Sequence, residues 1–297
     1  MTGILIIDKP GGLTSFGALI RVKKIIKQKK CGHTGTLDPM ATGALTVLLG
    51  GATRFSELLP DSDKAYTATL RLGTVTDTLD ITGKVLGQNE VTAKRADFEK
   101  ALGQFKGKIM QTPPMFSAVS VDGRRLYELA REGKEVERAA REVEIHSIEL
   151  TGCDEESNEY TIDVSCSSGT YIRSLADDIG RTLGCGATLT ALRRTKANGF
   201  SVNSALTLEA LAEAVENGTL AERLISVDTA LGAYPAVKVT DAQAVRFSNG
   251  GELMTDRLGG AKEPGLYRVY SPGGTFLGVG ENRADGNLYV KRVFRDE

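Results

Sequence analysis

The sequence predicts an α/β (α+β) fold in which a mixed β-sheet is flanked by helices and is followed by a small β-rich module. Two observations indicate this. Segments with the period of a strand and segments with the period of a helix are interleaved over about the first 230 residues, which is typical of a sheet covered by helices. From about Tyr234 onward, glycines are frequent and the apolar segments are short, as in small β-rich domains. We therefore divide the chain into residues 1–232 and 233–297.

The N-terminal segment predicts a strand followed by a helix. Residues 4–7 (ILII) have the composition of a short buried strand, and Thr14 or Ser15 can cap the helix that follows. Apolar side chains recur in this helix at helical spacing, with lysines on the other face. We expect the apolar side chains to face the core, namely Phe16, Leu19, Ile20, Val22, Ile25 and Ile26.

The next segments alternate between loops, strands and one helix. Residues 31–43 are dense in Gly, Thr and Pro and predict a loop, and residues 44–50 predict a second buried strand. Residues 65–73 alternate between apolar and polar side chains, as a half-buried strand does. We expect a helix at residues 94–103 and irregular structure at residues 109–118, which contain two adjacent prolines.

The second half of the main body predicts further helices and strands. We expect a helix at residues 124–131, strands at residues 141–154 and from residue 160 onward, and a helix at about residues 171–183. The β-rich end of the chain then predicts four short strands, at residues 236–240, 265–271, 275–281 and 287–294.

Charge is unevenly distributed along the chain. The 297 residues have a net charge of −1 and a pI of about 6.3, which argues weakly against a nucleic-acid partner. Residues 21–30, however, carry six cations and no acid, so one face can bind phosphate while the whole chain stays neutral. These cations are Arg21, Lys23, Lys24, Lys27, Lys29 and Lys30.

Several function classes are disfavoured by composition. Four cysteines lie far apart without C-x-x-C spacing, so we expect reduced thiols in the cytoplasm and no metal site. The apolar start is too short for a signal peptide, and no apolar run approaches the roughly 18–20 residues that cross a bilayer. The chain has no G-x-x-x-x-G-K-[ST] loop, and we expect no cofactor.

The segment most suggestive of chemistry is G-H-T-G-T-L-D-P-M-A-T-G at residues 32–43. Pro39 biases Asp38 away from helical conformation, so the carboxylate is held on an extended piece of chain. An aspartate with an ordinary pKa of about 3.9 is ionised at pH 7 and can act as a nucleophile or a base. An Asp-Pro pair by itself is equally a simple turn signal.

Residues 32–43 fit every fixed position of the motif G-H-T-G-x-L-D-P-x-A-T-G, and the chain resembles the TruB family of tRNA pseudouridine-55 synthases that carries it. Further blocks resemble family motifs in the same order, and the resemblance covers about residues 3–230. These blocks are residues 8–15 (D-K-P-x-G-x-T-S), 64–66 and 76–78 (K-x-Y and T-D-T), 113–118 (P-P-x-[YF]-S-A), 167–175 (S-x-G-T-Y-I-R-x-L) and 192–195 (L-R-R-T).

The resemblance implies that the protein isomerises uridine 55 in the T-arm loop of tRNA, with Asp38 as the essential carboxylate. Asp38 either attacks the target nucleoside or removes a ribose proton to give a glycal, after which the base rotates and rejoins through C5. Tyr66 resembles the aromatic residue that stacks on the flipped base and helps to remove the C5 proton. Tyr171 and Leu192 resemble residues that line the pocket, and Arg173 resembles the arginine that keeps the carboxylate ionised and aimed.

His33 resembles the histidine that enters the T loop and fills the space left by flipped bases. Flipping costs a few kcal/mol, and aromatic contacts return about 1–3 kcal/mol per base, so His33 and Tyr66 together can balance the cost. The residues alone leave other interpretations open: a core tyrosine at position 66, a solvated charge at Arg173, and a loop histidine at His33.

The resemblance also implies two surfaces for RNA. The last 65 residues or so resemble, in position and β texture, the PUA domain of bacterial family members, which contacts the acceptor-stem side of tRNA. No obligatory protein partner is implied. Candidate contacts to the RNA backbone are Lys9, Lys23, Lys24, Lys27, Arg124 and Arg193, with Arg125, Arg194 and Lys196 as further candidates.

Three alternatives compete with this interpretation. A guide-RNA-dependent synthase of the dyskerin type shares the aspartate motif, but residues 123–133 are more similar to the standalone enzymes. A non-catalytic RNA-binding protein or RNA chaperone would need a broken site, although a tRNA-folding role beside catalysis is compatible with the sequence. A hydrolase that uses Cys31 and His33 lacks an evident partner acid.

Overall fold

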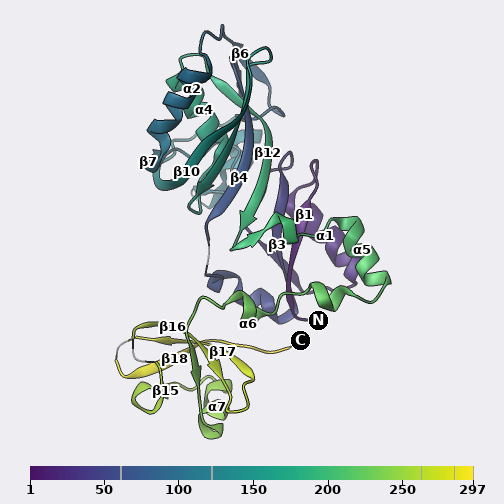
Figure 1. The fold of residues 1–297 in the computed structure, drawn as a ribbon, viewed down its shortest axis with the longest axis vertical. Coiled ribbons are helices and arrows are strands. Elements are labelled where there is room, and N and C mark those ends of the chain that lie inside the picture. Colours follow the sequence, from purple (N-terminus) through teal and green to yellow (C-terminus); the bar gives the residue numbers. More distant parts are fainter. Residues whose placement is uncertain (61, 122, 262, 284, 297) are drawn as a thin grey trace.

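The chain builds a large mixed sheet, whose strands run in the order β1-β3-β12-β4-β11-β10-β7, with β2 paired to β3 and β13 paired to β12 (Figure 1). The computed structural model describes residues 1–60, 62–121, 123–261, 263–283 and 285–296. All neighbours in this sheet are antiparallel except β12 and β3, which are parallel. The strands are β1 (Gly3–Lys9), β2 (Cys31–Thr34), β3 (Thr42–Leu49), β4 (Lys64–Leu72), β7 (Gly107–Gln111), β10 (Arg141–Asp154), β11 (Glu159–Cys166), β12 (Ala187–Ala197) and β13 (Phe200–Ser201).

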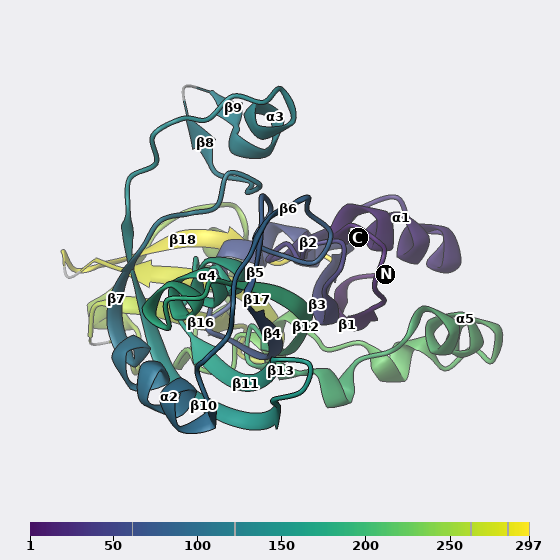
Figure 2. The ribbon, with the colours of Figure 1, turned by 90° about the horizontal axis from the view of Figure 1, so that it is seen from above.

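Helices cover the two ends of this sheet. Helices α2 and α4 pack on the β4, β10, β11 and β12 part, and α1 and α5 pack on β1 and β3 (Figure 1). Two small hairpins, β5–β6 and β8–β9, are separate from the large sheet, and Figure 2 shows the second of them, with α3, projecting away from the body. The elements are α1 (Ser15–Ile26), α2 (Arg95–Leu102), α3 (Leu126–Arg131), α4 (Ile172–Thr182), α5 (Leu208–Glu216), β5 (Thr74–Thr76), β6 (Val85–Gln88), β8 (Ser120–Val121) and β9 (Arg124–Arg125).

A second sheet of five strands closes the chain and has its own apolar core. It lies against the 3-10 segment η1 (Gly50–Leu58) and the short helix α6 (Val227–Ala230), where Phe55, Phe276 and Phe294 meet with ring centroids 5.4–6.4 Å apart. The mixed main sheet and this β-rich end confirm the predicted fold class. Its elements are β14 (Ala236–Lys238), α7 (Asp241–Ser248), β15 (Leu253–Met254), β16 (Gly265–Tyr270), β17 (Phe276–Asn282) and β18 (Asn287–Val293).

Helix α1 begins where the sequence predicts, with the Thr14 side chain accepting a hydrogen bond from the Gly17 amide at 2.9 Å. The predicted apolar face is partly wrong, because Phe16 is 62% exposed and Ile20 is 38% exposed. The buried stripe is centred near Val22, and at 3.6 residues per turn Phe16 and Ile20 fall outside it. The buried members are Ser15, Ala18, Leu19, Val22 and Ile26.

Three segments of the sheet were not predicted correctly. Residues 31–34 are a strand rather than a loop, because β2 pairs with β3 in the register His33 to Val47. Residues 107–111 form β7, the edge strand beside β10, so the irregular segment begins only after Gln111. Strand β12 was not assigned from the sequence, yet it lies between β3 and β4 in the middle of the sheet. Among the described residues, no helix has the length and apolarity that a membrane crossing requires.

Candidate active site

Asp38 lies on the short loop that joins β2 to β3, and the N-terminal turn holds this loop from both sides. The Ser15 hydroxyl accepts a hydrogen bond from the Leu37 amide at 2.8 Å. On the other side of Asp38, the Gly12 amide donates to the Pro39 carbonyl at 2.8 Å. The carboxylate is therefore flanked by two fixed backbone positions, and the loop cannot move independently of the start of α1.

Arg173 holds the Asp38 carboxylate with both prongs of its guanidinium. Its Nε lies 2.9 Å from one carboxylate oxygen and its Nη2 donates to the other at 3.0 Å. The Arg173 side chain is 5% exposed and also donates to the carbonyls of Thr78 (3.1 Å) and Phe116 (2.8 Å). A paired, bidentate arrangement of this kind fixes both the distance and the orientation of the carboxylate.

Asp80 is the third charged residue of the cluster that Asp38 and Arg173 form. It was not identified as a site residue from the sequence. Its carboxylate lies 3.7 Å from the Arg173 Nη1, and the residue is 4% exposed. One oxygen accepts hydrogen bonds from the Thr78 hydroxyl (3.0 Å) and from the amide (2.9 Å) and hydroxyl (2.5 Å) of Thr82. The signal in the sequence was the run D-T-L-D-I-T, in which an aspartate is followed by threonine two residues on, a common local capping pattern.

Burial dominates the electrostatics of Asp38. Removal from water raises the pKa of its carboxyl group above the usual value, Arg173 and Lys9 lower it, and the nearby Asp80 charge raises it. The net direction is upward, so the protonated form persists to a higher pH than for an ordinary aspartate. The carboxylate is nevertheless reachable, since its side chain is 32% exposed.

Tyr66 and Leu192 lie in one apolar cluster with Leu37, the neighbour of Asp38. Each is 7% exposed, Tyr66 on β4 and Leu192 on the adjacent β12. Burial raises the pKa of the Tyr66 hydroxyl to about 12. Tyr171 immediately precedes α4, where its amide and carbonyl are both hydrogen-bonded to the Gln111 side chain. Tyr66 and Leu192 therefore lie beside the Asp38 loop, and Tyr171 lies two residues before Arg173, the partner of Asp38.

His33 lies on β2, half-buried, five residues before Asp38. Burial lowers the pKa of its imidazole, and Arg194 lowers it further, so the ring is neutral at pH 7. Its buried Nδ1 has no hydrogen-bond partner within the described part of the chain. The neighbouring Cys31 has its thiol pKa raised by burial, and this disfavours a thiolate nucleophile beside His33.

The six candidate phosphate contacts do not form one cluster. Lys23 and Lys24 occupy the last turn of α1, and Lys27 follows it in the left-handed conformation. Arg193, whose side chain is 43% exposed, pairs with both oxygens of Asp8 at 3.0 and 2.7 Å. Arg124, on the projecting hairpin, forms an ion pair with Glu132, which directly follows α3.

Lys9 is not placed to contact phosphate, because it is 0% exposed. Its ammonium donates to the carbonyl oxygens of Pro10 (2.9 Å), Leu13 (2.6 Å) and Pro39 (3.4 Å). Burial lowers the pKa of Lys9 to about 8. Its side chain thus ties the N-terminal turn to the residue after Asp38, which corrects the expected contact between Lys9 and the RNA backbone.

No group of three or more His, Cys, Asp or Glu side chains that could hold a metal ion occurs among the described residues.

Comparison with known proteins gives consistent matches over the whole chain. Residues 23–172 match the model described as TruB family pseudouridylate synthase (N terminal domain), and residues 173–232 and 235–294 match two TruB C-terminal domain models. The chain is 47% identical to tRNA pseudouridine synthase B of Aromatoleum aromaticum, over 98% of this chain and 92% of the relative. It is 46% identical to tRNA pseudouridine synthase B of Burkholderia mallei, over 99% and 97% of the two chains. Among solved structures, a chain of a Cbf5-Nop10-Gar1 complex is similar with a TM-score of 0.76 and 26% identity, over 99% of this chain and 85% of that chain.

Proposed function

The chain belongs to the TruB family of pseudouridylate synthases, and on that basis we propose that it converts uridine 55 of the tRNA T arm to pseudouridine with Asp38 as the essential carboxylate. It is an isomerase that acts on a uridine of tRNA. The observation that carries the assignment of Asp38 is its bidentate pairing with the buried Arg173 on a loop held by the N-terminal turn.

The reaction exchanges one glycosidic bond for another. The C1′–N1 bond breaks, the uracil rotates, and a C1′–C5 bond forms; C5 then loses its proton and N1 gains one. We propose two routes for Asp38, attack on the nucleoside or removal of a ribose proton to give a glycal. Both need the ionised carboxylate in one orientation, and the two-pronged contact with Arg173 supplies this orientation.

The apolar walls around Asp38 support base flipping. We propose that the flipped uracil stacks on Tyr66 and lies against Leu192 and Tyr171, since Tyr66 and Leu192 pack in one cluster with Leu37 and Tyr171 lies two residues before Arg173. A neutral His33 suits stacking in the space that the base leaves better than ion pairing with phosphate. Stacking contacts of about 1–3 kcal/mol per base can offset an unstacking cost of a few kcal/mol.

Tritium release tests the function directly. Purified protein is incubated with unmodified tRNA that carries tritium at uridine C5, and tritium in water is measured. We expect about one equivalent per tRNA, and no release from a tRNA with cytidine at position 55. Tritium release from that control tRNA would come from another uridine and would contradict position 55 as the target. No release from the parent tRNA, despite binding, would overturn the standalone activity and favour a guided synthase or a chaperone.

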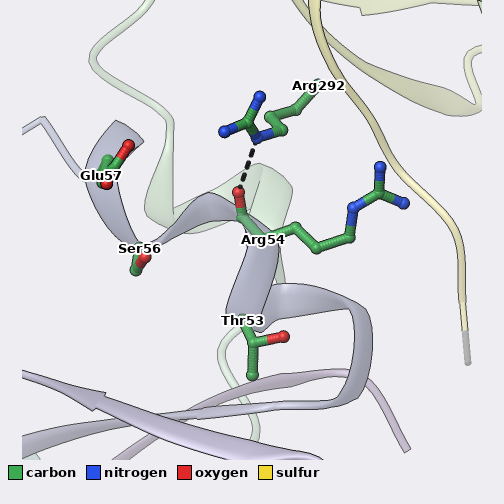
Figure 3. Close-up of a pocket in the computed structure, with 5 residues that line it drawn as sticks. All are labelled: Thr53, Arg54, Ser56, Glu57 and Arg292. Carbon is green, nitrogen blue, oxygen red and sulfur yellow. Dashed lines mark hydrogen bonds between the residues drawn. The ribbon is translucent and has the colours of Figure 1, made fainter.

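We further propose that the tRNA backbone reaches the C-terminal sheet across a cleft between η1 and β18. This cleft of about 320 Å³ is lined by Thr53, Arg54, Ser56, Glu57 and Arg292 (Figure 3). The Arg292 Nε donates to the Arg54 carbonyl at 3.1 Å, so an arginine of the 3-10 segment η1 and an arginine of strand β18 meet in this cleft. Paired cations at such a junction favour a phosphate over a neutral partner.

Binding to tRNA is also the reason to place the protein in the cytoplasm.

Charge reversal in this cleft is expected to weaken tRNA binding without slowing the chemistry. Arg54→Glu should raise the Kd for full-length tRNA by roughly 10-fold and lower the salt slope by about 1, because a phosphate contact is lost. The single-turnover rate at saturating enzyme should not change. Filter binding between low and moderate salt measures both quantities. Arg95→Glu on α2, whose side chain is 60% exposed, is the matched control, and equal weakening by both variants would contradict a specific contact.

A further inference from the structure

Arg194 is a charged side chain at the centre of the sheet that the proposed mechanism does not use. It lies on β12, where it pairs in register with Tyr66 on β4 and with Gly43 on β3. Residues opposite each other in an antiparallel pair point to the same face, so the side chains of Arg194 and Tyr66 are neighbours. Arg194 is 0% exposed. The backbone of β12 is so close to Gly43 that a β-carbon there would come 2.2 Å from the Arg194 carbonyl oxygen.

The guanidinium of Arg194 is incompletely paired. Its Nε donates to the Ala44 carbonyl at 2.7 Å and its Nη2 donates to the Gly35 carbonyl at 2.9 Å. Its Nη1 is buried and has no hydrogen-bond partner in the part of the chain that the structure describes. This nitrogen is 3.3 Å from the position that a β-carbon would take at Gly35, on the loop that carries Asp38.

The ionisable side chains around Arg194 are mostly bases. Arg194 lowers the pKa values of Lys9, Lys64 and His33, behind the larger effect of burial. On Tyr66 it acts in the opposite sense to burial, because a cation beside the hydroxyl favours the phenolate. The Arg194 cation therefore favours negative charge on the Tyr66 oxygen, although burial still holds the pKa of that hydroxyl at about 12.

Stability alone does not explain such a residue. Burial of an ion costs several kcal/mol even after relaxation, and well-packed apolar side chains of similar volume are often at least as stabilising. Two carbonyl contacts do not supply a counter-charge. A neighbouring group that becomes negative during the reaction would supply the missing counter-charge in that step.

We propose that Arg194 is a positioning residue for Tyr66, and that its buried guanidinium stabilises the negative charge of the tyrosine oxygen that removes the C5 proton. The inference rests on the proposed function. Burial keeps Tyr66 in its neutral form at rest, so its hydroxyl first gives its proton to water and the negative charge forms beside Arg194. The phenolate oxygen then takes the proton from C5, which restores the hydroxyl, and the C5–H electron pair forms the C5=C6 double bond. The electrons of the N1=C6 double bond move to N1, which takes a proton from water. That proton balances the one that Tyr66 gave to water, so no other reactant is consumed.

A kinetic isotope effect separates this role from a structural one. Single-turnover rates are measured with tRNA that carries hydrogen or deuterium at uridine C5. Arg194→Met should lower the rate by about 10²-fold, the scale of removing one preorganised charge donor. It should also raise the isotope effect above the wild-type value, because proton removal becomes slower than the earlier steps. Arg194→Lys should recover most of the rate and return the isotope effect toward that of the wild type.

Two further variants keep the test decisive. In a Tyr66→Phe background, Arg194→Met should add no more than about a 3-fold loss, since the two residues act in one step. Arg71→Met on β4, whose side chain is 42% exposed and pairs with Glu159, should leave the isotope effect unchanged. If Arg194→Met does not fold, Arg194→Gln carries the same test. The proposal would be overturned if Arg194→Met left the isotope effect unchanged and its loss of rate multiplied with the loss caused by Tyr66→Phe. A wild type that releases no tritium would instead overturn the proposed function.

Discussion

Asp38→Asn is expected to lower the single-turnover rate of tritium release from uridine C5 by at least ~10³-fold, because the amide cannot act as a nucleophile or a base. The substitution keeps the shape of the side chain and one oxygen that can accept from Arg173. The loop should stay in place, since Ser15 and Gly12 hold it through its backbone. The Kd for tRNA should therefore change by no more than about 3-fold, a value within the scatter of surface changes.

Stability measurements provide the control for this variant. Burial raises the pKa of Asp38, so the folded protein binds the Asp38 proton more tightly than the unfolded chain does. The wild-type protein therefore loses stability when the carboxyl group ionises, as pH rises through its folded pKa. The Asp38→Asn variant has a neutral amide and avoids this loss. We expect the thermal midpoint of Asp38→Asn at pH 7 to equal or exceed that of the wild type, because the amide does not carry the cost of a buried charge. A folded variant that retains more than about a tenth of the rate would contradict the proposed role, since general acid–base groups alone contribute ~10²-fold or more.

The elements that the sequence predicted well are those with strong local signals. Strand β10 was predicted with its observed bounds, and helices α2 and α4 were predicted to within a residue at each end. Strand β12 was missed because L-T-A-L-R-R-T-K-A contains three cations in the middle of a sheet. Those charges are accommodated by partners far away in the chain, such as Asp8 for Arg193, which no local pattern shows.

The candidate site depended on resemblance more than on physics. Asp38 and Arg173 are 135 residues apart, and only the ordered motifs linked them before the fold brought them to 2.9 Å. Asp80 lies in the run D-T-L-D-I-T and Arg194 in the block L-R-R-T, but neither pattern shows that the side chain is buried beside the site. Lys9 was expected to contact the RNA backbone, and because lysines are seldom fully buried, its burial under the N-terminal turn could not be predicted from its neighbours.

Arg173→Met is expected to lower the rate by about 10²-fold at pH 7 and to shift the acid limb of the rate profile to higher pH. Arg173 opposes the effect of burial on Asp38, so its removal raises the pKa of that carboxyl group further. The reactive carboxylate is then lost at a higher pH as the solution is acidified. Raising the pH should recover part of the rate, while the part that is due to lost orientation remains. Single-turnover tritium release between about pH 5.5 and 8.5 measures both parts.

Asp80→Asn provides a control with the opposite sign. The Asp80 charge raises the pKa of Asp38, so its removal should move the acid limb to lower pH. The plateau should fall by roughly 10-fold, because Arg173 loses the anion 3.7 Å from its Nη1 but keeps its contact with the Asp38 carboxylate. Shifts of opposite direction in the two variants follow only if both charges act on one titrating carboxylate. Identical profiles for Arg173→Met and the wild type would contradict the role of Arg173 in lowering the pKa of Asp38.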